Sequence, residues 1–300
     1  MDASKLMFKP GLMKGQRILV TGGGTGLGKE MAEGLLALGA DIYICGRRGD
    51  VLKDTAAELK AKHGGNIYPY ACDIRNHQNI ADMVGEIWQA GPLTGLINNA
   101  AGQFISRTED ISPRGFDAIA NIVFRGSFLM TTEVGKRWIE AKLPGSVVSI
   151  LVTWVWNGNP FTVPSAMSKA GLNIMTKSLA SEWGRYRIRL NAIAPGSFPT
   201  EGASARLNPG ARAVQDRMDS NPQDPMVMRR SGYMHELANL AAFLLAPGAE
   251  YLTGQTIAIT GGSELPGRES RLMEWTDEDW KQARESIQAT NEADRAKRTV

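Results

Sequence analysis

The stretch TGGGTGLG (residues 21–28) has glycines at a spacing that suits the binding of a phosphate group. It follows a short apolar run, RILV, and precedes a segment with apolar residues at helical spacing. The glycines at positions 22, 26 and 28 let the backbone turn sharply and approach a pyrophosphate, and the helix N-terminus offers free N–H groups. We therefore predict a dinucleotide-binding loop that comprises Gly22, Gly24, Thr25, Gly26, Leu27 and Gly28.

Two arginines, Arg47 and Arg48, follow the second apolar run, DIYICG (residues 41–46). In an NAD site an acidic residue at this place usually binds the ribose 2′-hydroxyl, whereas guanidinium groups bind a 2′-phosphate through forked N–H donors. Asp50 comes too late in the chain for the acidic role. Two solvated arginines in a loop are the alternative. The pair favours NADP(H) as the cofactor.

Polar residues also follow the third and fourth apolar runs. In CDIR (72–75), Asp73 could accept a hydrogen bond from the adenine amino group, and Arg75 could reach an anionic ligand. The stretch NNAAG (98–102) suits a close approach of the backbone to the cofactor ribose, which makes Asn99 a candidate for cofactor binding. An asparagine such as Asn98, taken alone, more often stabilises a turn.

These candidates all stand near the ends of short apolar runs that are rich in β-branched residues. The segments between the runs have apolar residues at the spacing of amphipathic helices. The alternation predicts an α/β fold, a single-domain Rossmann-type doubly wound parallel sheet. The expected strands are residues 17–22, 41–46, 66–73, 95–100, 146–152, 188–196 and 256–262.

Residues 1–14 are an N-terminal segment that precedes the NADP-binding catalytic domain, which we expect to span residues 15–262. Two later segments do not follow the alternation. Residues 197–232 are polar and rich in Pro and Gly, which predicts a substrate-covering insertion. Residues 263–300 are expected to be a C-terminal helical extension, in which Thr276 and Asp279 resemble a helix N-cap pair.

Composition excludes several classes of protein. The formal net charge of +3 is too small and too dispersed to indicate a nucleic-acid-binding surface. No stretch approaches the roughly 20 apolar residues that cross a bilayer, and the first residues do not resemble a signal peptide. Cys45 and Cys72, the only cysteines, are expected to be buried free thiols. We expect a cytoplasmic protein without nucleic-acid partners or membrane insertion.

The three histidines do not indicate a metal site. His63 and His77 are expected in polar loops. His235 begins the stretch HELAN, which lacks the second histidine of a zinc-binding helix.

Taken together, TGGGTGLG, CDIR, NNAAG, the segment with Ser165 and Lys169, and APGS (194–197) resemble the short-chain dehydrogenase/reductase family over residues 15–262. The usual motif of that family is Tyr-x-x-x-Lys, with a serine upstream and an asparagine on an earlier helix. This chain has Ser165 in place of the tyrosine, Val152 in place of the serine and Val123 in place of the asparagine. Only Lys169 is retained.

The resemblance also covers the region after the sixth expected strand and the last strand. It implies cofactor contacts from Pro195, Gly196, Ser197 and Phe198. Thr260 replaces the aspartate that is common in the last strand of the family, and nothing in the sequence explains this change.

One subgroup departs from the motif in the same way, the NADPH-dependent 2,4-dienoyl-CoA reductases of the mitochondrial type. The chain resembles them in TGGGTGLGK, NNAAGQFIS, VPSAMSKAGL, SLASEWGRY, ARLNP and ELANLAAFLL. In that subgroup a tyrosine at the end of the fifth strand and an asparagine after the fourth strand bind the thioester oxygen. The matching positions here hold Trp154 and Gln103.

These substitutions keep hydrogen-bond donors and remove an ionisable group. Reduction of a ketone needs an acid for the substrate oxygen, and neither the Ser165 hydroxyl nor the Trp154 indole can ionise at neutral pH. Reduction of a conjugated thioester needs donors toward an enolate oxygen, which the Trp154 N–H and the Gln103 amide could supply. Trp154 could instead only pack, with Trp156 or Ser165 in the polar role. The pattern favours enolate stabilisation.

The resemblance further implies a CoA thioester as substrate and a homotetramer formed through the helices after the fourth and fifth strands. Arg47, Arg75 and Arg206 match arginines that contact cofactor or CoA phosphates, and Phe104 and Ser112 match residues near the acyl-CoA. Surface charge is the alternative for each arginine. Large apolar residues near the site are a weak indication of a bulky or cyclic acyl group; they are Trp154, Trp156, Phe161 and Phe198.

The sequence thus predicts an NADPH-dependent reductase of an α,β-unsaturated CoA thioester, either a 2,4-dienoyl or a related cyclic enoyl ester. Lys169 binds the nicotinamide ribose in this interpretation. Two alternatives stay open: a carbonyl or alcohol oxidoreductase of the short-chain family, and a catalytically silent NADP-binding protein.

Overall fold

The computed structural model describes residues 1–200, 227–265, 272 and 274–298. Its described residues fall into two compact units. The first comprises residues 1–200 and 230–261, and the second comprises residues 227–229, 262–265, 272 and 274–298. The predicted insertion at 197–232 therefore lies mostly outside the described residues.

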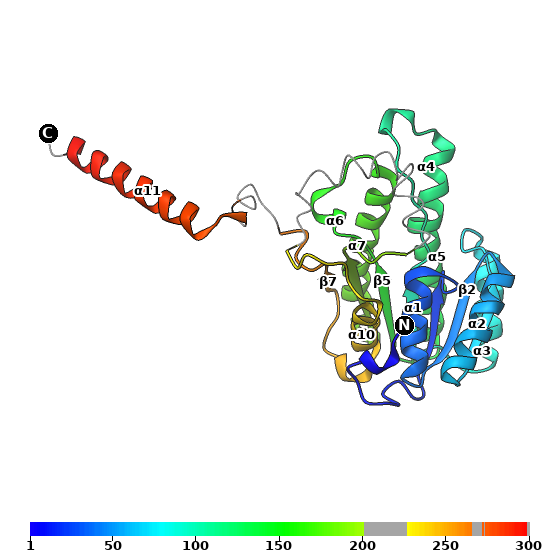
Figure 1. Cartoon of the computed structure of the whole chain (residues 1–300). Coiled ribbons are helices and arrows are strands. Elements are labelled where there is room, and N and C mark those ends of the chain that lie inside the picture. The colour runs from blue at the N-terminus through cyan, green and yellow to red at the C-terminus, as the bar shows by residue number, and fades with distance from the viewer. Residues whose placement is uncertain (201–226, 266–271, 273, 299–300) are drawn as a thin grey trace. The chain divides into compact units, whose positions relative to one another are not determined.

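The first unit alternates strands and helices along the chain (Figure 1). Its strands are β1 (Arg17–Thr21), β2 (Asp41–Gly46), β3 (Ile67–Ala71), β4 (Gly95–Asn98), β5 (Gly145–Ile150), β6 (Ile188–Pro195) and β7 (Thr256–Ile259). Its helices are α1 (Gly26–Ala37), α2 (Gly49–His63), α3 (His77–Gln89), α4 (Pro113–Ala120), α5 (Ser127–Glu140), α6 (Trp154–Asn157), α7 (Val163–Trp183) and α10 (Met234–Leu245). Short turns of other helix types are η1 (Ala3–Lys5), η2 (Thr108–Asp110), the π-helix η3 (Asn121–Gly126), η4 (Gly184–Tyr186) and η5 (Pro247–Ala249).

The strands form one sheet of seven strands in the order β3-β2-β1-β4-β5-β6-β7, and every neighbouring pair is parallel. The order reverses direction between β1 and β4, as in doubly wound sheets. The sequence-based prediction of a Rossmann-type doubly wound parallel sheet is therefore confirmed.

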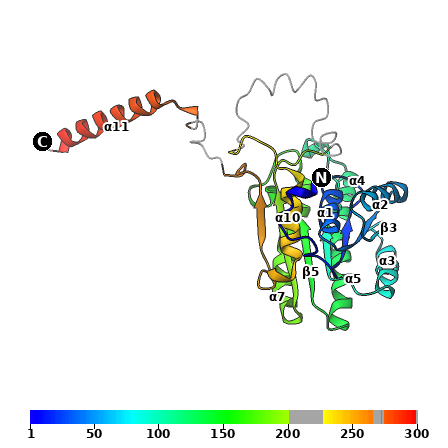
Figure 2. The same ribbon diagram turned by 60° about the horizontal axis from the view of Figure 1, so that its bottom comes forward.

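Apolar side chains cover both faces of the sheet. Because side chains alternate along a strand, Ile18 and Val20 of β1 face one core while Leu19 faces the other. The first core also contains residues of α1, α2 and α10, and the second contains residues of α3, α5 and α7. Helices α1 and α10, far apart in the sequence, lie side by side (Figures 1 and 2). Burial on both faces explains why the strands are almost continuously apolar.

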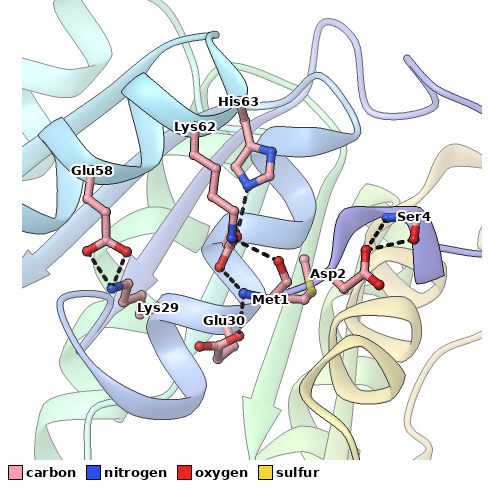
Figure 3. A network of polar contacts seen from close by, with 9 residues as sticks. Met1, Asp2, Ser4, Lys29, Glu30, Glu58, Lys62 and His63 are labelled. Carbon is pink, nitrogen blue, oxygen red and sulfur yellow. Dashed lines mark hydrogen bonds and ion pairs between the residues drawn. The ribbon is translucent and has the colours of Figure 1, made fainter.

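A buried carboxylate joins α1 to α2 and to the beginning of the chain (Figure 3). Glu33, on α1, accepts hydrogen bonds from Lys62 at 2.7 Å and from the Met1 ammonium at 2.9 Å, and contacts His63 Nε2 at 2.8 Å. Burial alone raises the pKa of Glu33, but these three groups outweigh it and lower the pKa to about 2. His63 and His77 were both expected in polar loops, and both expectations are wrong. His63 ends α2 and faces Glu33, and His77 begins α3.

The second unit contains helix α11 (Asp277–Arg298). Thr276 and Asp279 cap its beginning reciprocally: the Thr276 backbone N–H donates to Asp279 at 2.8 Å, and the Asp279 N–H donates to the Thr276 hydroxyl at 3.2 Å. The expected N-cap pair is therefore confirmed. Trp275 and Trp280 pack edge to face across this cap, with ring centroids 4.9 Å apart.

Two expectations from composition concern the described residues directly. Cys45 and Cys72 are buried free thiols, as expected, and burial raises the pKa of the Cys72 thiol to about 11. Among the described helices, none has the length and apolar character needed to cross a membrane.

Candidate functional site

The candidate residues come together at one edge of the sheet. Because all seven strands are parallel, the segments that follow them leave the sheet at the same, carboxyl-terminal edge. Ligands of doubly wound sheets bind at this edge, next to the point where the strand order reverses. In this chain that point lies between β1 and β4, so the glycine-rich loop after β1 faces the segment after β4.

The loop between β1 and α1 requires glycine at several positions. Gly22 and Gly26 have φ values of +67° and +56°, in the left-handed region that only glycine adopts at little cost. A Cβ atom on Gly28 would lie 2.4 Å from the Asn99 side chain and 2.5 Å from the Gly22 carbonyl oxygen. Thr25 precedes α1 without capping it through its side chain. The uncapped helix N-terminus and the bare backbone fit a pyrophosphate.

Asn99 holds this loop against β4. Its side-chain amide donates to the backbone oxygens of Thr21, at 2.9 Å, and Gly22, at 3.4 Å. The Thr21 hydroxyl in turn accepts from the backbone N–H groups of Asn99 and Ala100, both at 2.9 Å. Asn99 was predicted as a cofactor ligand. Its amide N–H groups are used inside the protein, so its visible role is to position the phosphate loop.

Arg47 and Arg48 lie after β2, and both are exposed. Arg48 is the N-cap residue of α2. Within the described part of the chain, neither guanidinium forms a hydrogen bond or an ion pair. Gly46 pairs with Ala71 in the register of β2 and β3, so Arg47 lies near the end of β3 as well. The two cations are therefore available to an anion at this edge.

Asp73 and Arg75, predicted as separate ligand contacts, bind each other. The Arg75 guanidinium donates to Asp73 through Nε at 2.9 Å and through Nη2 at 2.5 Å. The side-chain hydrogen bond from Arg75 lowers the pKa of Asp73, so the carboxylate is charged at neutral pH. Arg125 also donates to the Arg75 carbonyl oxygen at 2.6 Å.

Lys169 is the most unusual charged group of the site. It lies on α7, is only 4% exposed, and its ammonium donates to the carbonyl oxygen of Ile150 at the end of β5. Burial lowers the pKa of Lys169 to about 8, and no carboxylate contributes to that shift. Such a cation retains N–H donors for a ligand, which fits a cofactor ribose.

The other three predicted catalytic residues precede this lysine in the chain. Ser165 is buried in the first turn of α7, Trp154 begins the short helix α6 after β5, and Gln103 lies after β4. Trp154 and Gln103 are half-buried. In the residues that the structure describes, none of these three side chains forms a hydrogen bond. The site thus offers neutral donors that the protein itself leaves unused.

The positions of the missing family residues are apolar. Val123 lies in the π-helix η3, fully buried in an apolar cluster with Ile119, Leu151 and Leu172. π-Helical turns often occur at functional sites because they shift side chains relative to a regular helix. Val152, in the place of the family serine, is half-buried. Neither side chain can pass a proton.

The residues after β6 connect the two ends of the predicted insertion. Ser197 and Ser231 share a hydrogen bond of 2.9 Å between their hydroxyl groups, and the Gly232 N–H donates to the Ser197 carbonyl oxygen at 2.8 Å. The Phe198 ring is buried against Gly232, where a Cβ atom would lie 2.3 Å from it. Gly196, after Pro195, meets Thr260 closely. These contacts hold the segment after β6 next to residues 231 and 232.

The residues predicted to contact the substrate lie in different parts of the fold. Phe104 packs on the same apolar cluster as Val123, and it lies beside Gly115 of α4. Ser112 is the N-cap of α4, and its hydroxyl accepts from the Gly115 N–H at 3.1 Å. The visible role of Ser112 is therefore structural. Arg206 lies outside the described residues.

Asn98, the last residue of β4, is a buried polar group to which the sequence analysis gave no role in the site. Its amide donates to the Thr131 hydroxyl on α5 at 2.7 Å, and its oxygen has no hydrogen-bond partner among the described residues. It was read as a turn residue. Its place next to Asn99 in NNAAG was the one signal that could have indicated this buried role. A buried asparagine at a strand end needs hydrogen-bond partners on the neighbouring elements.

Comparisons with known proteins agree with this geometry. The family model described as enoyl-(acyl carrier protein) reductase matches residues 22–264. The chain is 40% identical to a Caenorhabditis elegans protein named probable 2,4-dienoyl-CoA reductase 3, over 91% of this chain and 90% of that protein. It is 36% identical to a probable 2,4-dienoyl-CoA reductase of Bacillus subtilis, over 84% of this chain and 98% of that protein.

Among solved structures, that of a protein described as a putative 2-deoxy-D-gluconate 3-dehydrogenase from Agrobacterium tumefaciens, with bound NADP, superposes with a TM-score of 0.76 at 28% identity. The match covers 86% of this chain and 100% of that one. The sheet order, the glycine-rich loop, the buried lysine and these relatives lead to one conclusion. The chain belongs to the short-chain dehydrogenase/reductase family of oxidoreductases, in the branch that the enoyl-reductase model describes.

Proposed function

We propose that the protein is an NADPH-dependent reductase of a 2,4-dienoyl or related cyclic enoyl CoA thioester. The observation that carries this proposal is the composition of the site around Lys169. The lysine is retained, while Ser165 replaces the family tyrosine and the candidate partners of the substrate oxygen, Trp154 and Gln103, are neutral donors without hydrogen bonds to described residues. The two relatives named as 2,4-dienoyl-CoA reductases support it.

When bound, NADPH would supply a hydride to a carbon of the conjugated acyl group, and the electron pair of that double bond would move toward the thioester oxygen. The glycine-rich loop and the N-terminus of α1 would hold the pyrophosphate of NADPH, and Lys169 would donate to its ribose. Trp154 N–H and the Gln103 amide donate to the thioester oxygen, where negative charge develops as an extended enolate. A donor of this kind contributes typically ~3–4 kcal/mol to such a reaction. The proton reaches carbon from water, so the site needs no ionising phenol.

Preference for NADPH follows from Arg47 and Arg48. Both guanidinium groups are exposed at the end of β2 and lack ion-pair partners among the described residues. A 2′-phosphate can accept from them, whereas an acidic residue for a 2′-hydroxyl does not stand at this place. The CoA phosphates would then bind Arg75 and Arg206. Arg75 can do so only by sharing or leaving its ion pair with Asp73.

We further propose a homotetramer in the cytoplasm. Four large apolar side chains are between 46% and 60% exposed on η3, α5 and α7, which suits burial against a second copy. They are Phe124, Phe128, Met167 and Ile174. The unpaired thiols of Cys45 and Cys72 fit a reducing compartment.

An assay of NADPH oxidation tests the function. We expect consumption with 2,4-hexadienoyl-CoA and none with 3-ketoacyl-CoA esters. Turnover of only the ketoacyl esters would instead establish a carbonyl reductase, and cofactor binding without turnover of any thioester would establish a silent NADP-binding protein. A cyclic enoyl-CoA in the same series separates the two forms of the proposal.

The Trp154→Phe variant tests the donor. It removes one N–H and keeps an aromatic ring, so we expect kcat for the dienoyl ester to fall about 100-fold, as for other single oxyanion donors. Trp88→Phe, on α3, is the matched control and should leave kcat unchanged. Unchanged kcat in Trp154→Phe would remove the indole from the mechanism.

A further inference from the structure

Three large apolar side chains stand exposed on two segments that follow neighbouring strands. Ile105 (41% exposed) lies between β4 and α4, and Trp156 (49%) and Phe161 (53%) lie between β5 and α7. Strands β4 and β5 are paired and parallel, so both segments leave the sheet at the edge where the glycine-rich loop lies. The Ser106 N–H donates to the Phe161 carbonyl oxygen at 3.0 Å, so the two segments meet at these residues.

The two segments repeat one arrangement. In the first, the donor candidate Gln103 is followed by Phe104, which packs on the apolar cluster around Val123, and then by the exposed Ile105. In the second, the donor candidate Trp154 is followed by Val155, which packs on the same cluster, and then by the exposed Trp156. Each segment therefore places an exposed apolar side chain two residues beyond a donor candidate for the thioester oxygen.

Phe161 stands where its backbone favours a different residue. Its φ is +62°, in the left-handed region, where a bulky side chain is strained and glycine is not. The turn is held by Asn159, whose amide donates to the Pro160 carbonyl oxygen at 3.2 Å and to the buried Thr162 hydroxyl at 3.0 Å. More than half of the Phe161 surface remains exposed. Packing inside this chain therefore does not account for an aromatic residue at this position.

We propose that Ile105, Trp156 and Phe161 form an acyl rim, which binds the apolar part of the acyl chain beyond the conjugated double bonds. The rim makes the enzyme selective for acyl groups that extend well past the diene. This inference rests on the proposed function, because it assigns the substrate class of the same site. Binding of a longer chain buries apolar surface on both sides, and water then leaves the strained Phe161 ring.

The Phe161→Gly variant tests the rim. Glycine accepts the positive φ, so the fold is retained, and only the ring is lost. We expect the ratio of kcat/KM for 2,4-decadienoyl-CoA to that for 2,4-hexadienoyl-CoA to fall about tenfold, since an apolar contact of this size discriminates by that order. Trp156→Ala should shift the same ratio in the same direction.

Arg187→Gly is the matched control. Arg187 also has a φ of +62°, but it is exposed and precedes β6, at the opposite edge of the sheet. It receives the same backbone change without loss of an apolar contact, and the ratio should stay at the wild-type value. An unchanged ratio in both Phe161→Gly and Trp156→Ala, with hexadienoyl-CoA still reduced, would overturn the rim and leave the proposed function intact. A wild-type enzyme that reduces neither dienoyl ester would overturn both.

Discussion

Glu33 and Lys169 are charged side chains buried to a similar degree, at 2% and 4% exposure, in opposite surroundings. Glu33, on α1, meets three groups that donate to it or carry positive charge. These groups belong to Met1, Lys62 and His63, which are labelled in Figure 3. Lys169, on α7, has one carbonyl oxygen and no carboxylate. Accordingly the pKa of Glu33 falls to about 2, which favours its charged form, whereas burial lowers the pKa of Lys169 to about 8, which disfavours it.

The difference separates a group that stabilises the fold from one that serves a ligand. A buried charge costs free energy unless it is paired and hydrogen-bonded. At Glu33 the protein supplies the partners itself. At Lys169 it supplies one acceptor, so the remaining donors find their partners only in a bound molecule. Perturbed groups of the second kind are typical of functional sites.

Lys169→Met gives the largest expected effect. The variant keeps the length of the side chain and removes the donors, so cofactor and substrate lose their alignment. We expect kcat/KM for the dienoyl ester to fall about 100-fold or more. Lys177→Met, an exposed position on the same helix, is the control and should be fully active. Wild-type kinetics in Lys169→Met would contradict a role for the lysine at the site.

The same variant should be more stable than the wild type at neutral pH. Removal of a buried, uncompensated charge relieves its desolvation cost, and we expect a gain of about 1–3 kcal/mol in the free energy of unfolding. Urea unfolding of both proteins without cofactor measures it. A loss of stability would show that the hydrogen bond to Ile150 outweighs the desolvation of the ammonium.

Glu33→Gln should lower stability and spare activity, whereas Lys169→Met should raise stability and lower activity. The change at Glu33 leaves Lys62 and His63 without this carboxylate and leaves the Met1 ammonium with only Glu30 among the described carboxylates, at 3.6 Å, so we expect a loss of about 2–4 kcal/mol in the free energy of unfolding, with kcat unchanged in the folded protein. Glu58→Gln is the matched control, because Glu58 pairs with Lys29 at 2.7 Å on the surface, and its loss should cost below about 1 kcal/mol. Equal losses in the two variants would show that burial of Glu33 adds nothing to its ion pairs.

The comparison also shows what the sequence can and cannot predict. The seven strands were predictable because burial on both faces of a parallel sheet leaves short, continuous apolar runs. Lys169 was identified by its place in a motif, and the glycine-rich loop by its place between a strand and a helix. In both cases the neighbouring residues in the sequence indicated the structural role.

Glu33 could not be identified in this way. It is one acidic residue in an amphipathic helix, and its partners lie on a second helix and at the beginning of the chain. The pairing of Asp73 with Arg75 and the Asn99 clamp on the loop were also missed, although every residue was named. The sequence analysis assigned Asp73, Arg75 and Asn99 to a ligand, whereas the fold satisfies polar groups internally wherever the geometry allows it.

The dependence of stability on pH gives the smallest expected effect and distinguishes the two groups most directly. The pKa of Lys169 is about 8 in the folded protein and ordinarily 10.5, so between these values the unfolded chain binds more protons, and stability rises with pH. The advantage of Lys169→Met over the wild type should therefore shrink, by about 1 kcal/mol between about pH 7 and pH 9. The stabilisation by Glu33, with a folded pKa of about 2 against an ordinary 4.5, is present above 4.5 and lost as the pH falls toward 2, so the deficit of Glu33→Gln should shrink there. Subtracting the free energy of unfolding of each variant from that of the wild type at the same pH cancels the contributions of the other titrating groups. The stability difference between the wild type and Lys169→Met should shrink at high pH, and that between the wild type and Glu33→Gln should shrink at low pH. If both differences shrank at the same end of the pH range, the assignment of opposite roles to the two groups would be refuted.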